Sequence, residues 1–290
     1  MSEQTHNVMQ RLNDPHPLVT VELRPPRAGM SYEKSMDVWI DMFHSVQRLA
    51  RRDTLVFLTD QAVGQVEEEN LGHLTANLGD DVDRSKIVPF LTTKHSLDYC
   101  RMYAKRAASF GFEALTVLGG DRHVGPARCV EHAYELRRVI KQDMPGMTLG
   151  GWANPHADPV AQVDYLLDDD FSGDFFLTQI VSHHDLPAVE GFVNEIAKRG
   201  LTVPGIFGVF LYRSGNPKTL ETLGQFFPVP VRQVRQEFAA GATPIDICIR
   251  SIKALFELGI TRVYVSNLGY KRVDAQYRKI VSELGLQAVR

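Results

Sequence analysis

A single acidic residue stands inside a short run that otherwise favours a β-strand. Glu22 follows the β-branched run 19–21, and the strand-like segment ends at the proline pair that begins with Pro25. A carboxylic acid that is partly desolvated has a raised pKa and can donate a proton near neutral pH. Glu22 is therefore a candidate functional residue, with an ion pair to Arg24 as the structural alternative.

Polar residues also follow the other apolar runs of the chain. These groups are Thr59-Asp60-Gln61, Thr92-Thr93-Lys94-His95, Gly119-Gly120-Asp121-Arg122, Trp152-Ala153-Asn154-Pro155-His156 and Thr178-Gln179. The carboxyl ends of parallel strands meet at one edge or mouth, where binding and catalysis are concentrated. Polar ends that stay in phase with the strands indicate an enzyme or a small-molecule binding protein.

Eight short apolar runs supply the strands that must position these groups. They cover residues 17–23, 54–59, 86–92, 113–118, 147–152, 175–180, 203–211 and 261–267. Helical stretches are predicted between them, at residues 34–51, 96–110, 126–143, 158–170, 186–199 and 270–285, and the connection 212–260 is predicted to hold two helices. Continuous apolar strands that alternate with helices indicate a parallel sheet covered on both faces.

Eight such strands are the number that closes a barrel. We therefore predict an α/β fold, a single-domain (β/α)8 TIM barrel over residues 16–290, preceded by a flexible N-terminal arm over residues 1–15. An open doubly wound sheet is the alternative, but no GxGxxG sequence follows the first strand.

The composition narrows the function classes. The 290 residues carry a net charge of −3 and no basic block, so no nucleic-acid partner is expected. No apolar run is long enough to span a membrane, and we predict a cytoplasmic protein with no membrane partner; a homo-oligomer is left open. The three cysteines (Cys100, Cys129 and Cys248) form no CxxC pair and predict neither disulfides nor a zinc site.

Taken in order, the strand-end motifs resemble those of the methylenetetrahydrofolate reductase family, a flavin-dependent barrel of one-carbon metabolism. The motifs are "VELRPP", "LTDQA", "PFLT", "VLGGD", "GGWANPH", "FFLTQ" and "VPGIFGV", and the resemblance spans residues 17 to 287. It implies an oxidoreductase that interconverts 5,10-methylenetetrahydrofolate and 5-methyltetrahydrofolate with NADH or NADPH, through bound FAD. The sequence leaves open whether this serves methionine biosynthesis or methyl catabolism.

The resemblance also implies roles for individual residues. Glu22 would be the acid, Asp121 would lie beside the pterin and the flavin, and Gln179 would hydrogen-bond the pterin. Contacts to the flavin cofactor would come from Thr59, Gly120, Trp152 and His156. Two residues beyond the motifs are further candidates for substrate binding: Tyr212, in an apolar shelf after the seventh strand, and Arg272, near the glutamate tail of the folate.

Several positions depart from the family pattern and weaken the case for FAD. The family carries arginine where Gly119 stands, histidine at Phe90, tyrosine at Asp60, and a flavin-contacting lysine in the region of the acidic run 168–170. Added negative charge disfavours a diphosphate nearby, although Lys94, His95, Arg122 and His123 could compensate. Two alternatives follow: direct hydride transfer without flavin, and a catalytically silent folate- or flavin-binding partner of a methyltransferase.

The "SHHD" segment, Ser182 to Asp185, raises a different possibility. Together with His156 and Asp121 it could hold the metal of a barrel hydrolase, since such sites use histidine and aspartate at strand ends. That class opens with an H-x-H sequence on its first strand, which this chain lacks. We therefore predict no metal, and we expect Asp185 to cap the helix that begins near Leu186.

Overall fold

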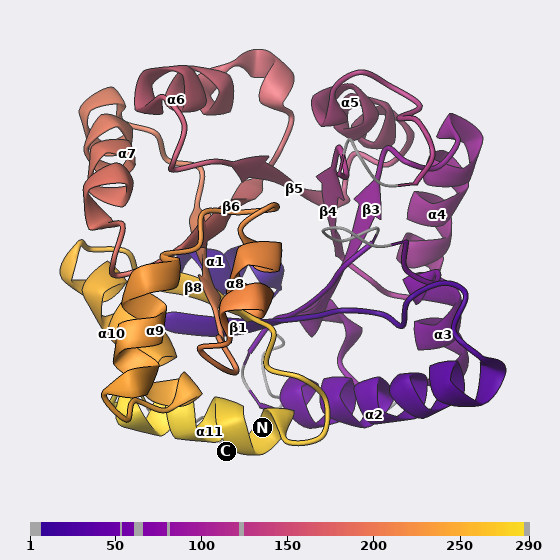
Figure 1. Cartoon of the computed structure of the whole chain (residues 1–290). Helices are drawn as coiled ribbons and strands as arrows, with labels where there is room; N and C mark the ends of the chain where they lie inside the picture. Colours follow the sequence, from indigo (N-terminus) through magenta and orange to yellow (C-terminus); the bar gives the residue numbers. More distant parts are fainter. Residues whose placement is uncertain (1–6, 53, 61–65, 80–81, 122–124, 287–290) are drawn as a thin grey trace, which may run out of the picture.

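The eight predicted strands form a closed parallel barrel in which each strand pairs with its neighbours in sequence order (Figure 1). The computed structural model describes residues 7–52, 54–60, 66–79, 82–121 and 125–286. The last strand pairs with the first and closes the ring, with Leu18 opposite Arg262 and Val21 opposite Val265. The predicted (β/α)8 fold is confirmed.

All eight strands overlap the apolar runs of the sequence. They are β1 Leu18–Leu23, β2 Val56–Leu58, β3 Ile87–Thr92, β4 Ala114–Leu118, β5 Thr148–Ala153, β6 Phe175–Val181, β7 Gly205–Phe210 and β8 Arg262–Ser266. Within β1 the side chains alternate. Val19, Val21 and Leu23 pack outward toward the helices, whereas Thr20 and Glu22 share the opposite, inward face.

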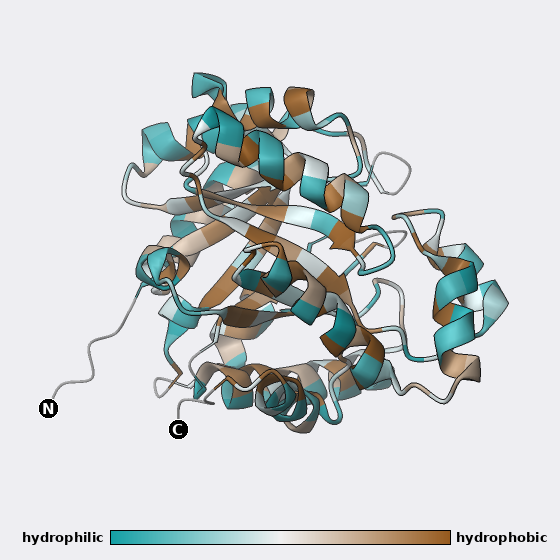
Figure 2. Ribbon diagram, turned by 90° about the vertical axis from the view of Figure 1, so that its left-hand side faces the viewer, coloured by the Kyte–Doolittle hydropathy of each residue, from teal (hydrophilic) through white to brown (hydrophobic). Residues whose placement is uncertain are grey.

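Helices surround the barrel and bury their apolar faces against it. The predicted helices are α2 Tyr32–Ala50, α4 Leu97–Ser109, α5 Ala133–Asp143, α6 Pro159–Leu167, α7 Leu186–Arg199, α10 Pro244–Glu257 and α11 Val273–Glu283. Figure 2 shows hydrophobic residues concentrated in the strands and on the helix faces beside them, with hydrophilic residues on outer turns. No helix in the described part of the chain is long and apolar enough to cross a membrane.

The connection after β7 differs from the expectation of two helices. It holds three: α8 Pro217–Leu223, α9 Val231–Ala239 and α10. A short helix α3, Asn70–Asn77, was also not predicted. Helices α3, α8 and α9 have seven to nine residues, too few turns for a clear apolar periodicity.

A helix also forms where a loose arm was expected. Helix α1, Val8–Asn13, starts with a capping box in which Asn7 and Gln10 exchange hydrogen bonds. Val8 and Leu12 are 1% and 0% exposed and join the apolar cluster inside the barrel that contains Phe57. The expectation of a flexible arm is therefore wrong for residues 8–13, because two apolar side chains are enough to hold this turn against the barrel.

Candidate active site

A cavity of about 1020 Å³ lies at the C-terminal end of the barrel. The strand ends form its sides, and residues of the segment 216–227, which includes α8 and is called the cap segment below, form another wall. Aromatic side chains fill the barrel below it, with Phe57 6.1 Å from Phe90 between ring centroids. Six residues selected from the sequence line this one cavity: Glu22, Thr59, Gly120, Asp121, Trp152 and Gln179.

Glu22 extends from the inward face of β1 into the cavity. The hydroxyl of Ser266 on β8 donates a hydrogen bond to Glu22 Oε1 at 2.6 Å. Burial raises the pKa of the Glu22 carboxyl above its ordinary value, and the Ser266 hydrogen bond and the charge of Arg24 offset only part of that increase. Arg24 itself donates from Nε to Glu67 at 3.1 Å. A half-buried carboxyl with a raised pKa is suited to donating a proton.

A bulge in β6 places Gln179 in the wall. The register between β6 and β7 shifts between Leu177 and Ile180, so consecutive residues Gln179 and Ile180 both line the cavity. Gln179 Oε1 accepts a hydrogen bond from the Ile180 backbone N–H at 2.9 Å, and its Nε2 lies 3.5 Å from the Phe226 carbonyl. The amide oxygen of Gln179 is thus held by a hydrogen bond of normal length, whereas its amide nitrogen makes only a long one.

The last strand contributes two residues that the sequence analysis missed. Tyr264 and Ser266 alternate along β8 and both line the cavity. The Tyr264 hydroxyl donates to the Thr178 carbonyl at 2.6 Å and so supports the β6 bulge. Gly208 makes room for it, because a Cβ at this position would lie 2.4 Å from the tyrosine oxygen. The alternation of polar and apolar residues over Arg262–Ser266 could have indicated that Tyr264 and Ser266 share the inward face of this strand.

The glycine turn after β4 carries Asp121 to the cavity. Gly120 has a φ of +73°, which glycine adopts without strain. Arg128, another residue that the sequence analysis missed, donates from Nη2 to the Gly120 carbonyl at 2.7 Å and lines the cavity. This turn and Arg128 together form the wall next to Asp121.

Two of the four cations that could compensate for the missing arginine, Lys94 and His95, make contacts elsewhere. Lys94 donates from Nζ to the Pro126 carbonyl at 2.9 Å. His95 Nε2 lies 2.9 Å from Asp60 Oδ2, and although burial opposes its charge, Asp60 raises the pKa of His95. Neither Lys94 nor His95 lines the cavity, whereas the Asp60 carboxylate does. Gln61, Arg122 and His123 lie outside the described residues.

Three residues selected from the sequence do not line the cavity. Tyr212 is 3% exposed and packs beside Phe210, where burial raises its pKa. Arg272 is exposed at the N-terminus of α11. His156 donates from Nε2 to the Ile180 carbonyl at 2.8 Å and therefore supports the cavity wall from behind. The positions of these three side chains do not support direct contacts to a ligand in the cavity.

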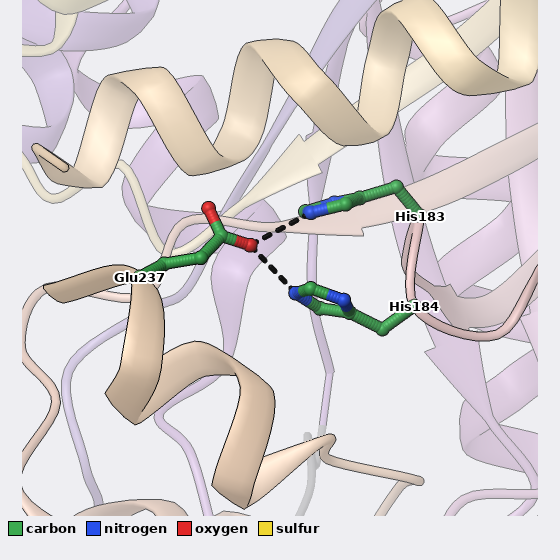
Figure 3. Close-up of side chains that lie close together, drawn as sticks. All are labelled: His183, His184 and Glu237. Carbon is green, nitrogen blue, oxygen red and sulfur yellow. Dashed lines mark hydrogen bonds and ion pairs between the residues drawn. The ribbon is translucent and has the colours of Figure 1, made fainter. Parts of the chain in front are cut away.

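The "SHHD" histidines meet a partner that was not predicted (Figure 3). His183 Nε2 and His184 Nε2 lie 2.7 and 2.6 Å from the same atom, Glu237 Oε1 on α9. Burial and the adjacent His184 lower the pKa of His183, while Glu237 opposes this change. The grouping with His156 and Asp121 that the sequence analysis considered and rejected is absent from the potential metal-binding clusters of the described residues. Asp185 does take the N-cap position of α7, although its side chain makes no capping hydrogen bond.

Neither a protein-family model nor a curated protein matches the sequence. Among solved structures, the chain is similar to an uncharacterized protein from Clostridium thermocellum that binds two copies of 5-methyl-5,6,7,8-tetrahydrofolic acid. The identity is 15%, the TM-score is 0.68, and the match covers 96% of this chain and 99% of that one. It is also similar to apo-MsnO8, with 12% identity, a TM-score of 0.59, and coverage of 94% and 99%. Because both identities are below 25%, the similarity shows a shared fold and nothing further.

Proposed function

We propose that the cavity binds a reduced folate and that the protein interconverts 5,10-methylenetetrahydrofolate and 5-methyltetrahydrofolate with a reduced or oxidised nicotinamide. The observation that carries the proposal is a half-buried carboxyl, Glu22, that lines the same cavity as Gln179 and Asp121. The raised pKa of Glu22 agrees with a proton-donating role. The binding of 5-methyltetrahydrofolic acid by a barrel of the same fold supports the choice of ligand.

In the direction of reduction, Glu22 would act before the hydride arrives. Its carboxyl donates a proton to N10 as the bond from the methylene carbon to N10 breaks, which leaves an iminium between that carbon and N5. A hydride from the nicotinamide then adds to the methylene carbon and gives the methyl group. Ser266, which donates to Glu22 Oε1, stabilises the carboxylate left behind.

The neighbouring side chains would orient the pterin. Gln179 can hydrogen-bond its amide edge through Nε2, and Asp121 can accept hydrogen bonds from its amino groups. Trp152 offers an apolar face to the flat ring. Arg27 and Lys218 are exposed at the cavity wall, and we propose that they attract the glutamate tail in place of Arg272.

FAD was expected from the sequence, and three of the residues named for it line the cavity. Thr59, Gly120 and Trp152 are the residues that could contact its ring, and a bound flavin would relay hydride between nicotinamide and folate. Around the same wall, Asp60 adds negative charge, and Lys94 donates to a backbone carbonyl. Arg128 and Arg137 also line the cavity, and both donate to backbone carbonyls, which leaves less of their hydrogen-bonding capacity for a diphosphate. We therefore propose direct hydride transfer and keep the FAD-dependent route as the second candidate.

The test combines a spectrum with an activity assay. The absorption spectrum of the purified protein shows whether a flavin is bound, and NADH and NADPH oxidation is then followed with and without 5,10-methylenetetrahydrofolate. We expect oxidation that depends on the folate. Folate binding without oxidation of either nicotinamide, even after FAD is added, would support the silent binding protein instead.

A further inference from the structure

The His183–His184–Glu237 cluster lies outside the cavity and has no part in the chemistry proposed above. Its potential ligand atoms, one from each residue, all lie within 4.8 Å of one another. The two imidazole rings are 3.9 Å apart between centroids and tilted by 39°, so both Nε2 atoms face one carboxylate oxygen (Figure 3). The three side chains are 16%, 18% and 12% exposed, which leaves room for an ion to enter.

Neighbouring residues hold these side chains in place. Ser251 Oγ on α10 lies 2.8 Å from His183 Nδ1, on the far side of the ring from Glu237. Arg250 donates to the other carboxylate oxygen, Glu237 Oε2. Partners of this kind orient metal ligands in proteins. The histidine atom that faces the cluster is thus Nε2, and the carboxylate oxygen that faces it is Oε1.

We propose that His183, His184 and Glu237 bind a divalent transition metal of the zinc class. Two imidazole nitrogens and one carboxylate oxygen form a known zinc ligand set, which leaves a fourth position for water. Ligand atoms around tetrahedral zinc lie about 3.3 Å apart, so small rotations of the rings away from Glu237 would admit the ion. A thiolate-free site of this type also suits Co²⁺ and Ni²⁺.

The site would connect the barrel to the region that covers the cavity. The histidines lie in the turn between β6 and α7, directly after the strand that carries Gln179. Glu237 belongs to α9, which packs against α8 of the cap segment. A metal bound here would therefore fix α9 to the barrel rim. This inference does not depend on the identity of the ligand in the cavity.

The test uses the full-length, tag-free protein after treatment with a chelator and dialysis. Co²⁺ serves as the spectroscopic probe, and Zn²⁺ is titrated by calorimetry and by displacement of Co²⁺. We expect one equivalent of Co²⁺ with visible absorption typical of a tetrahedral site, displaced by one equivalent of Zn²⁺. His184→Gln and Glu237→Gln should each weaken zinc binding by about 100-fold or more, and Ser251→Ala by about tenfold.

His44→Gln is the matched control, because His44 is exposed on α2, away from the cluster. It should leave zinc affinity unchanged. A zinc affinity weaker than about 1 mM in the unaltered protein would overturn the proposal, as would equal affinity in Glu237→Gln. A lower melting temperature in Glu237→Gln without any response of the unaltered protein to metal would show a hydrogen-bonded contact only, which also overturns it.

Discussion

The two ends of the barrel use the same eight strands in opposite ways. At the N-terminal end, α1 places Val8 and Leu12 against the barrel interior, in one apolar cluster with Phe57. At the C-terminal end, the strands surround a cavity lined by carboxyl, amide and hydroxyl groups, among them Glu22 and Gln179. Changes at the closed end should therefore affect stability, and changes at the open end should affect binding and turnover.

The largest expected effect is on turnover at the open end. Glu22→Gln keeps the shape of the side chain and removes the proton donor, so kcat for methylenetetrahydrofolate reduction should fall by about 10²–10⁴-fold. Affinity for 5-methyltetrahydrofolate should change far less. Steady-state kinetics and calorimetry measure the two effects, and Glu33→Gln on the exposed start of α2 is the control. Unchanged kcat would exclude Glu22 as the acid.

The next effect concerns the closed end. Leu12 is fully buried, and Leu12→Ala should lower the free energy of unfolding by about 2–5 kcal/mol. Turnover of the folded variant should be unchanged. Urea denaturation measures the loss, and Asn13→Ala, at an exposed position of the same helix, should change stability by less than about 0.5 kcal/mol. A stability of Leu12→Ala equal to that of the wild type would show that α1 does not close the barrel.

A third change connects packing to the cavity. Gly208→Ala places a methyl group against the Tyr264 hydroxyl, and overpacking of this kind costs about 1–3 kcal/mol. Because Tyr264 supports the β6 bulge, folate affinity should fall as well. Gly191→Ala in α7 is the matched control, since its Cβ would meet no atom within 4 Å. Normal stability and affinity in Gly208→Ala would show that the tyrosine moves freely.

The smallest effect is a pH dependence. Because burial raises the pKa of Glu22 above the ordinary value of 4.5, the folded protein keeps a proton that the unfolded chain releases. The free energy of unfolding therefore falls as the pH rises from the ordinary pKa of Glu22 through its raised pKa in the folded protein. At a pH below both pKa values, Glu22 does not affect stability. Glu22→Gln removes this loss. Its urea midpoint should exceed that of the wild type at about pH 8 and match it at about pH 4; a constant difference would mean that Glu22 is solvated.

The fold was predictable because strand burial on both faces leaves a continuous apolar run in the sequence. The eight runs located every strand. Helix α1 was missed because its six residues are too few for a clear apolar periodicity. Helix α9 was missed for a similar reason, because its nine residues are too few for a clear apolar periodicity.

The site was predictable only in part. Glu22, Asp121 and Gln179 were found because polar groups at strand ends point to the mouth of a barrel. Which side chain faces inward depends on register and bulges, which local sequence does not specify. Tyr212 was therefore expected in the cavity and lies in the core, whereas Ser266 was overlooked.

Titration of 5-methyltetrahydrofolate into the protein by calorimetry tests the central claim most directly, that the C-terminal cavity is a reduced-folate site. We expect saturable binding. Gln179→Ala should weaken it by about tenfold, the effect of about 1.4 kcal/mol expected for lost hydrogen bonds, and Leu12→Ala should leave it unchanged. Absence of binding, or equal affinity in Gln179→Ala and the wild type, would contradict the claim.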